Sequence, residues 1–132
     1  MNDARIMSSI IPDGFHIDYA AVKIAEAVMG ERLFAITDAV TTTNIGPYPH
    51  YLAGEKYESA GILSGSALTM NKALKNLVTY AGVSIQNALK MCSLYPARAF
   101  GISNKHGMIA PGFDTNLVVL DNELDVVELI SS

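Results

Sequence analysis

Apolar and polar positions in the first third of the chain form two kinds of segment. Residues 33–36 (LFAI) are apolar without polar alternation, which is typical of a strand buried on both faces of a parallel sheet. A second short apolar segment lies at 14–17, and Asp18 after it is expected to cap a helix that Gly30 ends. The order strand, helix, strand predicts α/β architecture.

The segment 40–62 shows little periodicity of either kind and holds clustered Thr, Gly and Pro residues. It predicts a long, partly ordered loop that begins directly after Asp38. Loops of this length are uncommon inside compact domains and are often functional.

Helical periodicity returns in the second half of the chain. Ser66 is expected to begin an amphipathic helix that Gly82 stops, and Ser84 to cap a second helix. Pro96 suits the first position of a short third helix that Gly101 closes.

The last segment reads differently, because a turn signal at 111–112 (PG) precedes two apolar runs at 116–120 and 125–130. These runs predict an antiparallel pair of strands.

The composition makes this set of elements look incomplete. Of the 132 residues, 50% are hydrophobic and only 17% are charged, whereas an ordinary soluble domain carries about 25% charged residues. Two parallel strands cannot close a sheet, and an eight-stranded α/β barrel takes about 250 residues. We therefore expect the C-terminal piece of a larger fold.

Charge and cysteine content exclude several classes of partner. The net charge of −4 comes without Lys/Arg clusters, so neither nucleic acid nor an anionic membrane surface is an expected partner. No apolar run approaches the roughly 20 residues that span a bilayer. The single cysteine, Cys92, has no Cys or His at ligand spacing and cannot form an internal disulfide, which fits a reducing cytoplasm.

Asp38 is the strongest candidate for chemistry. It follows a buried strand, and α/β folds place their active sites at the carboxyl ends of such strands. His16 ends the preceding predicted strand and is expected at the same rim. A second interpretation stays open for each residue: Asp38 caps the following segment or bonds the backbone of Thr41 or Thr42, and His16 is a hydrogen-bonded structural residue rather than a metal ligand.

Other polar residues give weaker signals. Residues 63–66 (LSGS) precede the predicted helix, so their N–H and hydroxyl groups either bind an oxygen-rich ligand near its positive end or simply start the helix. His50 either reaches over the site from the loop or is solvated. Arg98 is interpreted as a structural ion-pair partner, and His106 as part of a surface turn.

Four motifs, taken in order, resemble the C-terminal part of the N-acetylglucosamine-6-phosphate deacetylase family, within the amidohydrolase superfamily. They are residues 13–18 (DGFHID), 34–39 (FAITDA), 63–70 (LSGSALTM) and 93–99 (SLYPARA). The tail, 107–112 and 116–121, is similar to the closing element of the wider superfamily. The resemblance covers residues 12–130.

The resemblance implies a fold and an activity. The fold is the C-terminal portion of a (β/α)8 TIM-type barrel in residues 1–105, followed in residues 106–132 by a β-hairpin of a small β-sandwich domain. The activity is hydrolytic deacetylation of N-acetylglucosamine 6-phosphate to glucosamine 6-phosphate and acetate in amino-sugar catabolism. The enzyme is expected to be a cytoplasmic homo-oligomer, a dimer, whose small-molecule partner is this amino-sugar phosphate.

The same resemblance assigns roles to residues. Asp38 is the catalytic acid/base, His16 contacts the sugar phosphate, and Leu63, Ser64 and Gly65 line the substrate pocket. A divalent metal, zinc or iron, polarises the acetyl carbonyl and lowers the pKa of the attacking water. The family's metal ligands lie in earlier barrel strands, so no metal ligand is assigned here and the isolated chain is expected to be inactive.

Two alternatives stay open. The chain is part of another metal-dependent amidohydrolase, dihydroorotase-like or directed at other amino sugars, in which Asp38 keeps its role while His16 and residues 63–65 meet a different ligand. Alternatively it is a non-catalytic module that self-associates or binds a partner.

Overall fold

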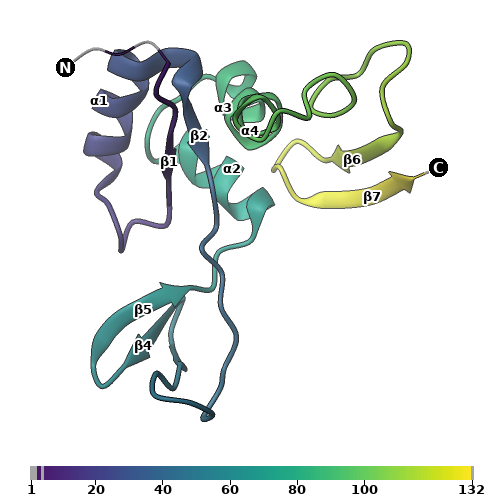
Figure 1. The fold of residues 1–132 in the computed structure, drawn as a ribbon. Helices are drawn as coiled ribbons and strands as arrows, with labels where there is room; N and C mark the ends of the chain where they lie inside the picture. The colour runs from purple at the N-terminus through teal and green to yellow at the C-terminus, as the bar shows by residue number, and fades with distance from the viewer. Residues whose placement is uncertain (1–2, 4, 132) are drawn as a thin grey trace.

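The computed structural model describes residue 3 and residues 5–131; residues 1, 2, 4 and 132 of the two predicted domains lie outside the described residues. The content is mixed α/β, with three separate small sheets and four α-helices in the described part (Figure 1). The elements in chain order are β1 (Ser8–Ile10), α1 (Tyr19–Met29), the 3₁₀ turn η1 (Gly30–Arg32), β2 (Leu33–Ala35), β3 (Tyr51–Ala53), β4 (Lys56–Ser59), β5 (Ile62–Ser66), α2 (Met70–Thr79), α3 (Ile85–Cys92), α4 (Leu94–Ala99), β6 (Asn116–Leu120) and β7 (Val126–Ser131).

The strands β1 and β2 form a parallel pair joined through α1, with Ile10 opposite Ala35, so the predicted strand-helix-strand order holds although its first strand lies elsewhere. As predicted, the carboxylate of Asp18 caps α1 by accepting from the N–H of Ala20, and Gly30 ends the helix with φ +55°. The prediction of a strand at 14–17 is wrong, because β1 comes earlier and residues 14–17 form the loop after it.

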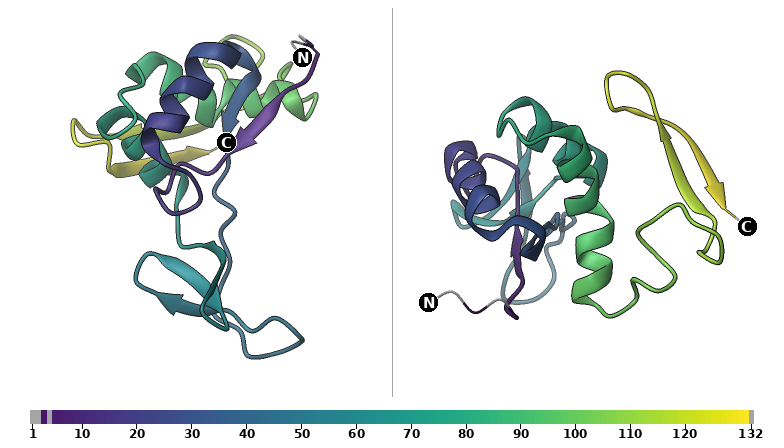
Figure 2. Two further views of the ribbon diagram at one scale, coloured as in Figure 1. Left: turned by 90° about the vertical axis from the view of Figure 1, so that its left-hand side faces the viewer. Right: turned by 90° about the horizontal axis from the view of Figure 1, so that it is seen from above.

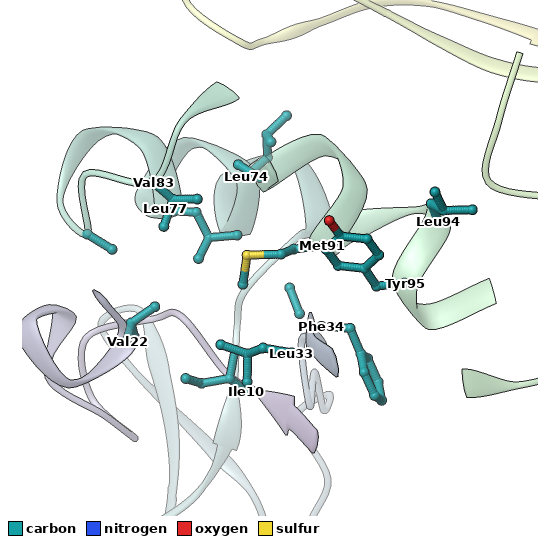
Figure 3. Close-up of a cluster of buried hydrophobic side chains, with 13 residues drawn as sticks. Ile10, Val22, Leu33, Phe34, Leu74, Leu77, Val83, Met91, Leu94 and Tyr95 are labelled. Atoms are coloured by element: carbon teal, nitrogen blue, oxygen red, sulfur yellow. The ribbon is translucent and has the colours of Figure 1, made fainter. Parts of the chain in front are cut away.

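The core lies around β2, and its strand residues are all buried. Figure 3 shows Leu33 of β2 among side chains from α2 and α3, including Leu77 and Met91, each at most 2% exposed. The chain's own helices therefore bury β2, so its apolar character does not by itself require strands from outside the chain. By contrast, Ile24 and Val28 on the outer side of α1 are 65% and 71% exposed.

The segment 40–62 is not the loop that its weak periodicity predicts. It contributes β3, β4 and the first residue of β5 to a three-stranded antiparallel sheet, which projects away from the helices (Figures 1 and 2). The β4–β5 hairpin closes on two residues, Ala60 and Gly61, with φ +50° and +77°. Positive φ at both central positions is the type I′ geometry that suits tight hairpins.

The helices after this sheet differ from the prediction mainly at their starts. Ser66 ends β5 rather than beginning a helix, and α2 starts at Met70. Ser84 caps α3 as predicted, accepting from the N–H of Asn87. The short α4 starts at Leu94, so Pro96 is its third residue. Within the described residues, no helix has the length and apolar character needed to cross a membrane.

The C-terminal strands β6 and β7 form the predicted antiparallel pair, with Leu117 opposite Ile130. Figure 2 (right) shows this hairpin as a separate ribbon beside the helices. A groove of about 340 Å³ lies between its side chains and those of α2 and α3. Contact with the helices is therefore incomplete.

Candidate active site

Asp38 lies just past the end of β2, as the sequence predicts, with its side chain 53% exposed. Its backbone has φ +49°, in the left-handed region. Residues other than glycine adopt this region at a cost, and such residues cluster at functional sites. The carboxylate is therefore presented to solvent by a backbone that the surrounding structure must hold in place.

Ser66 at the end of β5 provides that support. Its N–H donates to the carbonyl of Asp38 at 3.1 Å, and its own carbonyl accepts from the N–H of Val40 at 3.1 Å. Its hydroxyl donates to the carbonyl of Thr37, and the residue is 0% exposed. Three backbone positions around the acidic residue are thus fixed by one buried serine.

This pairing brings the predicted pocket residues to the neighbourhood of Asp38. Gly65 packs against Val40 so closely that a Cβ on Gly65 would lie 2.7 Å from a Val40 methyl carbon. Leu63 and Ser64, both half-buried, precede it on the same strand. The prediction that residues 63–66 lie at a helix start is wrong, because they belong to β5 and α2 begins later.

His50 is held rather than freely solvated. Its Nδ1 lies 2.8 Å from the hydroxyl oxygen of Ser64, and its backbone exchanges two hydrogen bonds with Thr43. The segment after Asp38 is thereby tied to β5. His50 orients a predicted pocket residue, a role that the sequence did not reveal.

The structure brings His16 and Asp38 together, although they come from different loops. Nε2 of His16 lies 3.9 Å from Oδ2 of Asp38, and the His16 side chain is 21% exposed. This separation exceeds a hydrogen bond but lies within ion-pair range when the imidazole is protonated. His16 is in the β1–α1 loop rather than at the end of a strand.

The sequence prediction does not include Asp13, which organises this loop. Its Oδ1 accepts from the N–H groups of Phe15 and His16, both at 2.9 Å, and its Oδ2 lies 2.7 Å from Nδ1 of His16. The signal was the Asp-Gly pair at 13–14, since Asp side chains characteristically bond the backbone two residues on.

Burial raises the pKa of Asp13, but the hydrogen bonds from the His16 backbone, the His16 ring and the Phe15 backbone outweigh it, so that its pKa lies below the ordinary value. The Asp13 side chain is only 3% exposed. Asp13 is therefore a buried anion at neutral pH, with two backbone N–H donors on Oδ1 and the His16 ring nitrogen Nδ1 against Oδ2.

Two further contacts fix the β1–α1 loop. The side-chain amide of Asn76 on α2, itself buried, donates to the carbonyl of Pro12 at 2.9 Å. Gly14 (φ +79°) lies over the ring of Tyr19, where a Cβ would meet the ring at 2.9–3.0 Å. Tyr19 in turn stacks on Tyr80, with ring centroids 5.1 Å apart. His16 is thus carried by an ordered loop.

The remaining candidates do not join this site. Arg98 pairs with Glu31 at 2.7 Å, which confirms the structural ion pair. His106 lies in a turn, 3.6 Å from Asp114. Burial raises the pKa of the Cys92 thiol to about 12, so it stays protonated and is a poor nucleophile near neutral pH. No group of three or more His, Cys, Asp or Glu side chains in the described part of the chain is placed to hold a metal ion, so these residues do not fit a self-contained metal centre.

Comparison of the sequence with models of known protein families gives a match. Residues 15–131 match the Amidohydrolase family, which is nearly the whole chain. The chain belongs to the amidohydrolase family. Apart from Asp13 and Gly14 of the first motif, the motifs identified in the sequence lie in the region that the family match covers.

Within the amidohydrolase family, the chain is similar to deacetylases of amino-sugar phosphates. It is 30% identical to the N-acetylglucosamine-6-phosphate deacetylase of Haemophilus influenzae over 135 residues, 95% of this chain but 35% of the relative. It is 31% identical to a putative N-acetylgalactosamine-6-phosphate deacetylase of Escherichia coli over 137 residues, 98% of this chain and 82% of the relative.

The structural comparison agrees. The crystal structure of N-acetylglucosamine-6-phosphate deacetylase from Pasteurella multocida matches with a TM-score of 0.90 and 31% identity, covering 96% of this chain and 35% of that chain. The predicted resemblance to this deacetylase family is confirmed. The chain spans 35% of the length of the Haemophilus and Pasteurella proteins.

Proposed function

We propose that this amidohydrolase chain is the acid/base-carrying part of an N-acetylglucosamine-6-phosphate deacetylase. The complete enzyme hydrolyses N-acetylglucosamine 6-phosphate to glucosamine 6-phosphate and acetate in amino-sugar catabolism. The observation that carries the proposal is the approach of His16 to Asp38, 3.9 Å apart, in a chain whose relatives in sequence and fold bear that name.

The residue roles follow from exposure and placement. Asp38, with an exposed carboxylate on a fixed backbone, takes a proton from water as the water attacks the acetyl carbonyl and returns it to the departing amine. His16 contacts the sugar phosphate, and Leu63, Ser64 and Gly65 line the pocket. The docking of β5 along residues 37–40 supports this grouping, because it carries the three pocket residues beside the acid.

The complete protein in this proposal has a (β/α)8 barrel and a small β-sandwich domain. Residues 1–105 supply C-terminal strands and helices of the barrel, for which the parallel β1–α1–β2 unit is the support. Residues 106–132 supply strands of the β-domain, for which the β6–β7 hairpin is the support. The divalent metal, zinc or iron, is bound by residues outside this chain. We place the enzyme in the cytoplasm as a homo-oligomer, a dimer.

A chimera tests this function. Residues 12–130 replace the aligned segment of the Haemophilus influenzae relative, and acetate release from N-acetylglucosamine 6-phosphate is measured at saturating substrate. We expect turnover in the chimera. Asp38→Asn should lower kcat by about 10²–10⁴-fold, because the proton acceptor is gone. Asp18→Asn is the matched control, since asparagine also caps helices and Asp18 lies outside the site.

Near-normal turnover in the Asp38→Asn chimera rejects the acid/base assignment. A chimera that folds and binds its metal but releases no acetate rejects the deacetylase proposal. The isolated chain is expected to release none.

The identity of the sugar in the substrate is tested separately, because the Escherichia coli relative is a putative deacetylase of the galactosamine epimer. The same chimera is therefore assayed with N-acetylgalactosamine 6-phosphate, and the two values of kcat/KM are compared. We expect the glucosamine epimer to be preferred. A higher kcat/KM for the galactosamine epimer would assign this chain to the second activity.

A further inference from the structure

The His16 ring lies between two carboxylates that differ in environment. Asp13 Oδ2 is 2.7 Å from Nδ1 and its side chain is 3% exposed, whereas Asp38 Oδ2 is 3.9 Å from Nε2 and its side chain is 53% exposed. One carboxylate is buried and already bonded to three nitrogen groups, whereas the other is exposed and available to a substrate.

The Asp13 contact decides which ring nitrogen carries the proton. An ionised carboxylate only accepts hydrogen bonds, and at 2.7 Å from Nδ1 it requires that Nδ1 be the donor. The two N–H groups on Oδ1 hold the carboxylate in this orientation. When the ring is neutral, its lone pair must therefore be on Nε2, the nitrogen that faces Asp38.

We propose that Asp13 is a positioning residue that fixes His16 as the Nδ1–H tautomer, so that Nε2 is the nitrogen that exchanges a proton with Asp38 once the two groups move from 3.9 Å to hydrogen-bonding distance. The proton transfer involves only the side chains of Asp38 and His16. The O–H bond of protonated Asp38 breaks, the proton forms an N–H bond at Nε2, and the products are an Asp38 carboxylate and an imidazolium whose charge Asp13 stabilises. The reverse transfer restores protonated Asp38 and neutral His16.

The consequence for catalysis rests on the proposed function. Asp38 must be ionised to accept a proton from water. When the shared proton is on Nε2 of His16, the Asp38 carboxylate is ionised and can accept one. With two carboxylates beside it, the imidazolium also offers Nε2–H as a donor to an oxygen of the substrate. Sequence alone could not reveal this array, because its three members come from two loops that only the fold brings together.

The test reads the tautomer directly. Long-range ¹H–¹⁵N spectra of the ¹⁵N-labelled chain are recorded at alkaline pH, where histidine side chains are neutral. We expect His16 in the Nδ1–H form. In Asp13→Asn the amide oxygen keeps the two backbone N–H groups and the NH₂ group then faces Nδ1, so we expect inversion to the Nε2–H form. Asp18→Asn removes the same charge from the same loop without touching His16, and should leave the Nδ1–H form.

The wild-type spectrum decides the matter even if Asp13→Asn fails to fold. An Nε2–H form of His16 in the wild type overturns the proposal, and so does an unchanged Nδ1–H form in a folded Asp13→Asn chain. No substrate is present, so these spectra stand or fall separately from the acetate measurements that test the deacetylase function.

Discussion

At the scale of single residues, buried polar groups set the geometry of the site. Asp13 directs the His16 ring, and Ser66 holds the backbone of Asp38 at φ +49°. Neither residue needs to contact a substrate. Their hydrogen bonds stabilise the fold, because leaving a buried polar group unpaired costs about 1–3 kcal/mol of the free energy of unfolding.

Asp13 also makes stability depend on pH. Its pKa in the folded chain is below the ordinary value, so folding is stabilised above that ordinary value and the stabilisation is lost as pH falls through the lower, folded-state pKa. We expect Asp13→Asn to lower the free energy of unfolding by about 1–3 kcal/mol near neutral pH. Urea unfolding from neutral pH to about pH 3 should show the difference between the two chains shrinking on the acid side. A difference that is constant over this range would mean that the charge of Asp13 contributes nothing.

At the scale of elements, the β3–β4–β5 sheet links the segment after Asp38 to the site. Ser66 pairs with residues 38–40 at one end of β5, and the β4–β5 turn closes the other end. The sheet thus forms part of the support of Asp38 rather than an independent appendage. Its turn is not optimal, because Ala60 adopts φ +50°. Glycine, which has no side chain, and Asn or Asp, which hydrogen-bond locally, adopt this region more readily than alanine.

This turn can be improved. Ala60→Asn gives the Asn-Gly pair that type I′ hairpins prefer, and we expect it to raise the free energy of unfolding by about 1 kcal/mol. Ala67→Asn is the control, because Ala67 is exposed and outside a helix but has no positive φ. Urea midpoints measure both variants. Equal midpoint shifts for the two would show that the backbone conformation of Ala60 is not the cause.

At the scale of the whole molecule, several kinds of contact attach the C-terminal hairpin to the helices. Gly107 lies against the backbone of Leu94 at the start of α4, and Lys75 of α2 pairs with Asp125 in the β6–β7 turn at 2.7 Å. Leu120 and Leu124 of the hairpin also pack against the hydrophobic core, although a groove remains between the hairpin and the helices. The attachment therefore combines apolar packing, an ion pair and a close backbone contact in the segment that leads into the hairpin.

Two glycines separate the effects of contact and conformation. Gly107 and Gly112 have nearly the same φ, +92° and +88°, but an added Cβ would lie 2.7 Å from Leu94 Cα at Gly107 and would meet nothing within 4 Å at Gly112. Both alanine variants should lose about 1 kcal/mol through strain, and Gly107→Ala about 1–3 kcal/mol more through overpacking. Thermal unfolding compares them. Equal losses would contradict a backbone contact at Gly107.

Apolar exposure predicts self-association of the chain. Val127 and Leu129 of β7 are 65% and 72% exposed, and the two-stranded sheet leaves an unpaired edge. We expect a dimer by light scattering after size-exclusion chromatography, and a shift toward monomer with Leu129→Lys. Leu52→Lys, at an exposed leucine of the β3 sheet, should leave the dimer intact. A monomeric wild-type chain would contradict this expectation.

Local patterns were sufficient for a large part of the fold. The buried strand at 33–36, the caps at Asp18 and Ser84, the glycine that ends α1 and the C-terminal hairpin all depend on neighbours in sequence, and the structure has them. The order of motifs likewise identified the family, and Asp38 and His16 were predicted at one rim. These features follow from side-chain chemistry within a few residues.

Tertiary structure alone decided the rest. β1 holds two serines and is a strand because β2 pairs with it, and residues 51–66 form a sheet because their backbones satisfy one another, although no apolar periodicity marks them. The support of Asp38 by Ser66 and the link of Asp13 through His16 to Asp38 join separate loops. Backbone pairing and buried hydrogen bonds act between groups brought close by folding, whereas the amino-acid order records only which groups are available.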